Sequence, residues 1–214
     1  MYVGRIVAAG CTRSGRNTGL YRVSSRSFPN RHAVPDSNSA AIVPKPGHET
    51  DVQKSPYIAY NCLRVVGTKA IVTNGAHTDP IAEKVEAGMP DRDALVQVLL
   101  TMDYEKDKYN TPRIAAIVDA GSAVAFLGIV RHDAVLVRAY ELQPGTFYYV
   151  CTYERNGLDS DDMDTGVAFD SAEQGCDYIL GQGVFAQFEK PVSAVAAVAG
   201  GQAGAPFEIA AKEA

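Results

Sequence analysis

The strongest β-strand signal in the chain lies in residues 113–154, RIAAIVDAGSAVAFLGIVRHDAVLVRAYELQPGTFYYVCTYE. Val, Ile, Tyr and Phe are abundant in this stretch, and these side chains favour extended backbone. Gly121, Asp133 and the pair Pro144-Gly145 interrupt the pattern with turn-forming residues. The stretch therefore predicts four consecutive strands, at residues 113–119, 122–131, 134–142 and 146–154.

Two hairpins are predicted upstream of this region. Short β-prone runs at residues 1–9 and 19–25 are joined by a polar, glycine-containing loop. Runs at residues 57–66 and 69–73 are separated only by the dipeptide Gly-Thr at 67–68, which is a typical two-residue hairpin turn. The first third of the chain is therefore expected to contribute strands as well.

Helical signals occur in three places. Thr-Asp-Pro at residues 78–80 supplies a capping residue and a first-turn proline, and a glycine eight residues after the proline ends this helix. A second helix is expected after Pro90, because the apolar residues within 95–102 form a broad face. Asp170 is expected to cap a third helix that runs to about Leu180.

The order of these elements predicts the fold class. Strands, then helices, then strands and a final helix indicate a layered α+β fold rather than alternating β–α–β units. No long linker divides the chain, so residues 1–214 are expected to form a single domain. The tail from about residue 194 to residue 206 is rich in Ala, Gly and Val. A packed pair of strands and a flexible end both fit it, and both alternatives stay open.

The overall composition is that of an ordinary globular protein. The chain has 214 residues, of which 46% are hydrophobic and 21% charged, and its formal net charge is −5. It has no apolar run of the roughly 18 residues that a membrane span needs, and it does not start with a basic stretch followed by an apolar one. We therefore expect a cytoplasmic protein that has no membrane partner.

Positive charge is concentrated at the start of the chain. Residues 1–31 contain six arginines and no Lys, Asp or Glu. Arginine recognises phosphates and carboxylates through paired hydrogen bonds, so this block favours a small anionic ligand, with solvated positions on a hairpin as the alternative. The acidity of the chain as a whole argues against a nucleic-acid partner.

Several common chemistries lack their motifs. The four cysteines, Cys11, Cys62, Cys151 and Cys176, form no CxxC pair and the histidines form no HxxxH pair. No metal site is therefore expected, and the thiols are predicted to be free and buried. The P-loop and GxSxG motifs are absent, and the acidic run at 159–164 has a methionine where a calcium loop needs an oxygen ligand.

Polar residues gather in four stretches of the sequence, at 21–31, 57–62, 74–79 and 103–113. The first reads YRVSSRSFPNR and leads from a predicted strand into a loop that carries serines and arginines. Guanidinium and hydroxyl groups on a loop held by proline suit a phosphate monoester. On the strand through 57–62, alternation places Tyr60 and Cys62 on one face and Asn61 on the other.

Five segments carry a family resemblance: MYVGRIVAAG (1–10), YRVSSRSFPNR (21–31), PYIAYNCLRVV (56–66), TNGAHTD (73–79) and YEKDKYNTPRIAAI (104–117). In this order, and across the chain to about residue 155, they resemble the archaeal-type inosine monophosphate (IMP) cyclohydrolase family. The resemblance implies a four-layer αββα sandwich like that of the N-terminal-nucleophile hydrolases. It also implies a purine nucleotide as substrate and no metal or organic cofactor, and it leaves homo-oligomer formation open.

The implied reaction is the last step of purine nucleotide synthesis. The carboxamide nitrogen of 5-formamidoimidazole-4-carboxamide ribonucleotide (FAICAR) attacks the formyl carbon, and water is lost. One feature departs from the usual chemistry of the implied fold, whose hydrolases expose Thr, Ser or Cys as residue one. Here Met1 is followed by Tyr2, so no N-terminal nucleophile is expected.

The ring closure needs one group to take a proton from nitrogen and one to protonate the departing oxygen. Tyr60 and Glu105 are the candidates, and the resemblance places catalytic groups at both. Without it, a core tyrosine and a solvated charge would be the favoured interpretations. Tyr60 would donate to the formyl oxygen and Glu105 would manage the amide proton, although these two roles are reversible.

The remaining site candidates concern binding. For the phosphate they are Arg26, Ser27 and Arg31, with Ser24 and Ser25 as helpers, and for the base and ribose they are Ser24, Asn61, Asn110 and Arg113. His77 and Cys62 are candidates for site lining only.

Two other functions stay open at this stage. An amidohydrolase of the same architecture would use an internal thiol such as Cys11 or Cys62. A nucleotide-binding protein without catalytic activity would keep the arginines but would not convert the formylated precursor.

Overall fold

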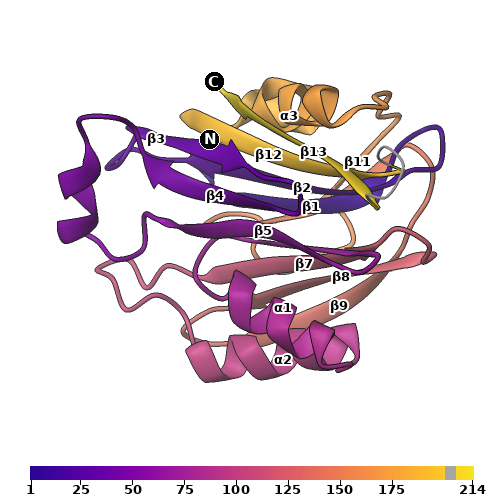
Figure 1. The fold of residues 1–214 in the computed structure, drawn as a ribbon, viewed down its shortest axis with the longest axis horizontal. Helices are drawn as coiled ribbons and strands as arrows, with labels where there is room; N and C mark the ends of the chain where they lie inside the picture. Colours follow the sequence, from indigo (N-terminus) through magenta and orange to yellow (C-terminus); the bar gives the residue numbers. More distant parts are fainter. Residues whose placement is uncertain (201–205) are drawn as a thin grey trace.

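The computed structural model describes residues 1–200 and 206–214, and in these residues two antiparallel β-sheets lie face to face (Figure 1). The first sheet contains, in spatial order, β11 (Met163–Thr165), β10 (Thr146–Cys151), β1 (Ile6–Cys11), β2 (Asn17–Ser24), β12 (Pro191–Ala199) and β13 (Phe207–Glu213). The second contains β3 (Arg31–Pro35), β4 (Ser39–Pro44), β5 (Tyr60–Val66), β6 (Lys69–Thr73), β7 (Arg113–Asp119), β8 (Val124–Val130) and β9 (Val135–Glu141).

Three α-helices occur in the part of the chain that the structure describes: α1 (Thr78–Glu86), α2 (Asp91–Met102) and α3 (Ala172–Gly181). Helices α1 and α2 pack on the second sheet, and α3 packs against β12 and β13 of the first sheet, on the opposite side of the molecule (Figure 1). Two short 3₁₀ turns, η1 (Glu49–Gln53) and η2 (Gly183–Gln187), accompany them. None of the described helices has the length and apolar character to span a bilayer.

The central core lies between the two sheets. Apolar side chains from both of them meet there, including Val7 and Tyr21 of the first sheet and Ile42, Leu63 and Ile114 of the second. The helices and loops cover parts of the other faces of the sheets, and strands β1, β2 and β12 are buried along almost their whole length. Burial on both faces removes the polar–apolar alternation that identifies a half-exposed strand.

The predicted four-layer αββα sandwich, and the α+β class with it, is wrong. The molecule is mostly β, because its described residues form 13 strands in sheets of six and seven, against three α-helices of 9, 12 and 10 residues. Seven strands about 4.8 Å apart span about 29 Å, whereas a helix is about 10 Å wide. The three helices therefore cover parts of the sheets and do not amount to layers comparable with them.

Most individual elements were predicted correctly, and the error in fold class comes from the strands that were missed. The strands at 69–73 and 113–119 have the predicted bounds, and both helices between residues 78 and 102 are present. Strands β3, β4 and β11 were not predicted. The third helix is also present, but Ser171 rather than Asp170 caps it, in a capping box with Gln174.

The tail contains a pair of strands wherever the structure describes it. Strands β12 and β13 pair antiparallel over seven residues, from Ser193 opposite Glu213 to Ala199 opposite Phe207. Of the two alternatives for this segment, the packed pair is therefore correct for these strands, and residues 201–205 lie outside the described residues.

Candidate active site

A cavity of about 290 Å³ lies where the start of the chain meets three loops and the segment after β10. Its lining comes from the segment before β1 (Tyr2, Arg5), the β2–β3 loop with the first residue of β3 (Ser25, Arg26, Ser27, Phe28, Arg31), the segment before β5 (Ser55, Tyr57, Ile58), the α2–β7 loop (Glu105, Asp107, Tyr109) and Tyr153 after β10. This volume is close to the lower end of the range for small-molecule sites, roughly 300–1,000 Å³.

Glu105 is the buried carboxylate of this cavity. Only 1% of its side chain is exposed, and its Oε2 accepts a hydrogen bond of 2.8 Å from Nη2 of Arg5. Its Oε1 lies 4.0 Å from Nη1 of Arg113. The backbone N–H of Glu105 donates to the carbonyl of Thr111, which fixes the loop around the carboxylate. Glu105 is therefore held between two guanidinium groups, one from the start of the chain and one from the first residue of β7.

Burial and the neighbouring charges have opposite effects on the pKa of Glu105. Burial raises the pKa of the Glu105 carboxyl group, while Arg5 and Arg113 act in the opposite direction. For Arg5, burial alone would lower the pKa, but the Glu105 carboxylate and nearby tyrosine hydroxyls outweigh it and raise the pKa. A buried carboxyl group with a raised pKa that lines a cavity is a candidate for proton transfer.

Guanidinium and hydroxyl groups gather in another part of the same lining. The Arg31 side chain is almost fully buried, and its Nε donates to the carbonyl of Phe28 over 3.1 Å. Within the described residues, no carboxylate oxygen lies within 4.0 Å of its guanidinium group. Arg26 is 59% exposed and stacks over the Tyr2 ring, with Ser25 and Ser27 beside it in the chain. This loop therefore presents donors suited to an anionic group.

Four tyrosines line the cavity, and none of them was among the predicted site residues: Tyr2, Tyr57, Tyr109 and Tyr153. The Tyr2 and Tyr153 rings stack at a centroid distance of 6.0 Å, and Tyr109 meets Tyr153 edge-on at 6.4 Å. Aromatic walls of this kind hold flat heterocycles. Tyr57 and Tyr109 do lie in the polar stretches that the sequence singled out. The sequence does not show, however, whether a tyrosine in such a stretch points into a cavity or away from it.

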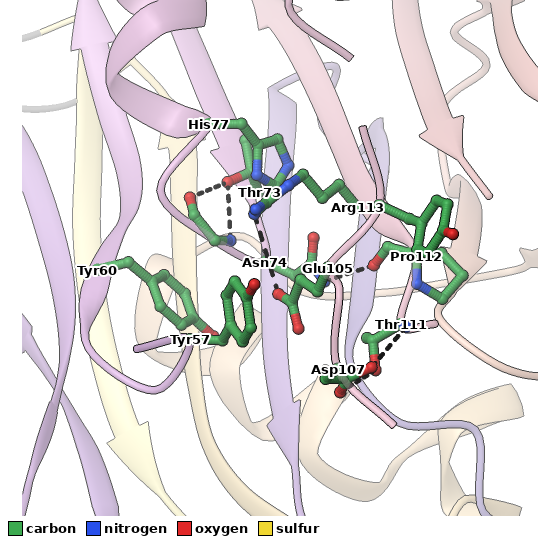
Figure 2. A network of polar contacts seen from close by, with 12 residues as sticks. Tyr57, Tyr60, Thr73, Asn74, His77, Glu105, Asp107, Thr111, Pro112 and Arg113 are labelled. Carbon is green, nitrogen blue, oxygen red and sulfur yellow. Dashed lines mark hydrogen bonds and ion pairs between the residues drawn. The ribbon is translucent and has the colours of Figure 1, made fainter. Parts of the chain in front are cut away.

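Tyr60 lies close to this cavity but not in its lining. The residue is buried on β5, and its hydroxyl is 2.6 Å from the hydroxyl of Tyr21. Burial raises the pKa of the Tyr60 hydroxyl. The positive charges of Arg31 and Arg5, which both line the cavity, act in the opposite direction but do not cancel this rise. Figure 2 shows Tyr60 in the same view as Tyr57 and Glu105.

Four other predicted site residues lie outside the lining. The Ser24 hydroxyl accepts a hydrogen bond from the buried Arg22, and Asn61 donates to the carboxylate of Asp79 on the face of β5 opposite to Tyr60. Asn110 is exposed in the loop next to Tyr109. The guanidinium group of Arg113 lies next to the Glu105 carboxylate (Figure 2). The structure thus brings Arg26, Ser27, Arg31 and Glu105 to the cavity and leaves the others around it or away from it.

The predicted lining residues Cys62 and His77 do not reach the cavity. Both are fully buried, and burial raises the pKa of the Cys62 thiol. Cys11 is also buried, with its pKa raised by the same cause. A reactive thiol needs a lowered pKa and access to its substrate, so the structure gives no support to an amidohydrolase that uses either cysteine.

The fold and this cavity define a protein with a site suited to a small anionic molecule. Residues 2–203 match the model of the IMP cyclohydrolase-like protein family, and the chain belongs to this family. It is 48% identical over 198 residues to the IMP cyclohydrolase of Methanocella arvoryzae, with 92% of both chains covered. It is 45% identical over 199 residues to that of Methanocaldococcus jannaschii and 42% identical over 197 residues to that of Methanosphaera stadtmanae, each covering 92% of this chain and 94% of the relative.

Proposed function

We propose that this chain is an IMP cyclohydrolase, which closes the ring of FAICAR to give IMP and water at the end of purine nucleotide synthesis, with residues 1–214 acting as one domain. The observation that carries the proposal is the match to relatives of that name over 92% of this chain and 92–94% of theirs. The new C–N bond joins the carboxamide nitrogen to the formyl carbon. The formyl oxygen leaves as water with one proton from each of the two nitrogens.

Positioning does much of the work in this reaction, because an amide nitrogen is a weak nucleophile. Holding the nitrogen against the formyl carbon can lower the barrier by up to about 7–11 kcal/mol. We assign the phosphate to Arg26, Ser27 and Arg31, since the β2–β3 loop presents their donors to the cavity. The tyrosine walls are suited to the flat imidazole.

Glu105 is the proposed group that handles the amide proton, because it is the buried carboxylate of the lining. Tyr60 stays the proposed proton donor to the formyl oxygen. The hydrogen bond with Tyr21 fixes its hydroxyl, and its two charged neighbours, Arg5 and Arg31, both line the cavity. Together such acid–base groups contribute about 10²–10⁴ in rate.

The function is tested by incubating the purified protein with FAICAR and following the ultraviolet change on ring closure. Turnover to IMP supports the proposal. Binding of IMP without turnover would instead indicate a nucleotide-binding protein, and release of formate would indicate an amidohydrolase. Tyr60→Phe keeps the ring and removes the hydroxyl, so unchanged turnover in this variant would remove Tyr60 from the mechanism.

The remaining assignments concern the base and ribose. Asn110 is the candidate nearest to the lining in sequence, since it follows Tyr109 in the α2–β7 loop. Ser24, Asn61 and Arg113 already contact protein groups, so direct contact with substrate requires these side chains to move. Asn110→Ala is therefore expected to raise KM more than Asn61→Ala, measured in the same assay.

A further inference from the structure

Three polar atoms behind the cavity have no hydrogen-bond partner among the described residues: Oε1 of Glu105, Nη1 of Arg113 and Nδ1 of His77. Their residues are 1%, 6% and 0% exposed. Buried polar atoms in folded proteins nearly always have a partner, in the protein or in ordered water. Three unpaired atoms in one place therefore indicate a ligand.

The three atoms lie close together, and those of Arg113 and His77 lie beside Gly75. Nη1 of Arg113 is 4.0 Å from Oε1 of Glu105. A Cβ added to Gly75 would lie 2.9 Å from Nη1 of Arg113 and 3.3 Å from Nδ1 of His77. Figure 2 shows the Arg113 guanidinium group between the His77 ring and the Glu105 carboxylate. Both nitrogens therefore lie close to the Cα of Gly75, where a side chain would crowd them.

The hydrogen-bonding roles of the three atoms follow from their surroundings. Nε2 of His77 is 3.0 Å from the carbonyl oxygen of Ile114, which can only accept, so Nε2 carries the proton and Nδ1 presents a lone pair. Burial and the charge of Arg113 lower the pKa of His77 to about 3, which keeps the ring neutral. The three atoms thus provide two acceptors, on His77 and Glu105, and one donor, on Arg113.

This set of groups matches one water molecule. A water donates two hydrogen bonds and accepts at least one, and buried waters typically make about three. We propose that His77, Arg113 and Glu105 bind a water molecule beside Gly75, and that this water positions the Glu105 carboxylate for ring closure. The second half of this inference rests on the function proposed above. His77 and Arg113 are then positioning residues that act through Glu105.

The titration of Glu105 depends on every group that faces it. These groups are Arg5 before β1, Asp107 in the same loop, Arg113 at the start of β7 and the neutral His77 before α1. A donor to the carboxylate favours its charged form. Loss of the water therefore moves the pKa of Glu105 upward.

Gly75→Ala in the full chain tests the inference, because its Cβ would crowd Nη1 of Arg113 and Nδ1 of His77 and leave no room for the water between them. We expect the acid limb of the kcat/KM profile to move up by about one pH unit, with kcat at low pH falling about tenfold and KM changing little. Gly121→Ala is the matched control, since the nearest atom to its Cβ would be Oδ1 of Asp119 at 3.9 Å, and it should leave the profile unchanged. His77→Phe removes the acceptor and should shift the limb in the same direction.

A high-resolution crystal structure of the wild-type protein gives the direct readout, which does not depend on any variant folding. Density within hydrogen-bond distance of all three atoms supports the site. The absence of such density, or an unchanged pH profile in a folded Gly75→Ala protein, would overturn the inference. A wild-type protein that holds this water but does not convert FAICAR would instead refute the proposed function.

Discussion

Two buried arginines in this molecule differ in how many of their hydrogen-bond donors have a partner. Arg22 on β2 is fully buried, and its guanidinium group donates to the Ser24 hydroxyl and to backbone carbonyls of residues 179–189, at the end of α3 and around η2. Arg113 is nearly as buried, but only its Nε has a bond, to the carbonyl of Asp103, while Nη1 has no partner among the described residues.

The difference separates a structural arginine, Arg22, from Arg113, which we propose to be a functional one. Every bond of Arg22 ends on the fold itself, so this side chain ties α3 and η2 to the first sheet. Burial lowers its pKa to about 10, which still leaves it charged at neutral pH. Arg113 keeps donor capacity next to Glu105, where a reaction needs groups that can still change partners. Incomplete satisfaction of buried polar groups marks the site.

The largest expected effect is on the functional side. Glu105→Gln keeps the shape and removes the proton acceptor, so kcat for FAICAR closure should fall about 10²–10⁴-fold, in line with the loss of acid–base catalysis. The ultraviolet assay measures it. Glu86→Gln, at an exposed position at the end of α1, is the control and should match the wild type. A Glu105→Gln protein with full turnover would show that this carboxylate is not part of the chemistry.

The next effect is on the structural side. Arg22→Leu leaves buried carbonyls at the end of α3 without donors, so the free energy of unfolding should fall by about 3 kcal/mol or more, which lowers Tm by roughly 6–12 °C. Calorimetry compares it with Arg13→Leu, which changes an exposed arginine in the β1–β2 loop. Equal Tm values for the two variants would mean that Arg22 does not tie the helix to the sheet.

A smaller effect, on the affinity for IMP, is expected to differ among the arginines at the start of the chain according to their position in the structure. Arg31→Ala should weaken IMP binding about 10- to 100-fold, because a charge-assisted hydrogen bond contributes about 1.5–3 kcal/mol. Arg26→Ala should weaken it less, since Arg26 is 59% exposed, and Arg13→Ala should leave it unchanged. Isothermal titration measures all three. Equal losses would mean that the arginine block acts only through diffuse charge.

The smallest expected effect is a pH dependence of the protein's stability that arises from His77, the neighbour of Arg113. The pKa of His77 is lowered in the folded state from 6.5 to about 3, so only the unfolded chain takes up this proton between these values. Stability is therefore full above about pH 6.5 and falls as the pH drops. Between pH 7 and pH 5, the wild type should lose about 1–2 kcal/mol more than His77→Asn in urea unfolding. Parallel losses would show that His77 is not buried as a neutral ring.

The sequence predicted local elements better than the fold class. The hairpin at residues 57–73 and the helices after Thr78 and Pro90 have strong local signals, and they are present. Strands β3 and β4 carry prolines and alanines, and β12 is an Ala-Val strand buried on both faces, so neither alternation nor β-propensity identifies them. These strands make the molecule mostly β and invalidate the αββα prediction.

Prediction of the site from the sequence was limited in the same way: residues with a local signal were found, and those without one were missed. Glu105, Arg26, Ser27 and Arg31 were predicted, because their polar stretches and the family resemblance single them out, and all four line the cavity. Arg5 was not predicted, since one arginine in an apolar run gives no local signal, and its hydrogen bond to Glu105 joins residues 100 positions apart. Contacts between such distant segments follow from sheet pairing, which a single sequence does not reveal.

The central claim is that one cavity holds the nucleotide phosphate on the Arg31 loop and the reacting ring against Glu105. A crystal structure of the protein with IMP bound tests it most directly. We predict the phosphate within hydrogen-bond distance of Arg31 and the purine ring beside Glu105 and the tyrosine walls. Density for the nucleotide away from either Arg31 or Glu105 would contradict this account.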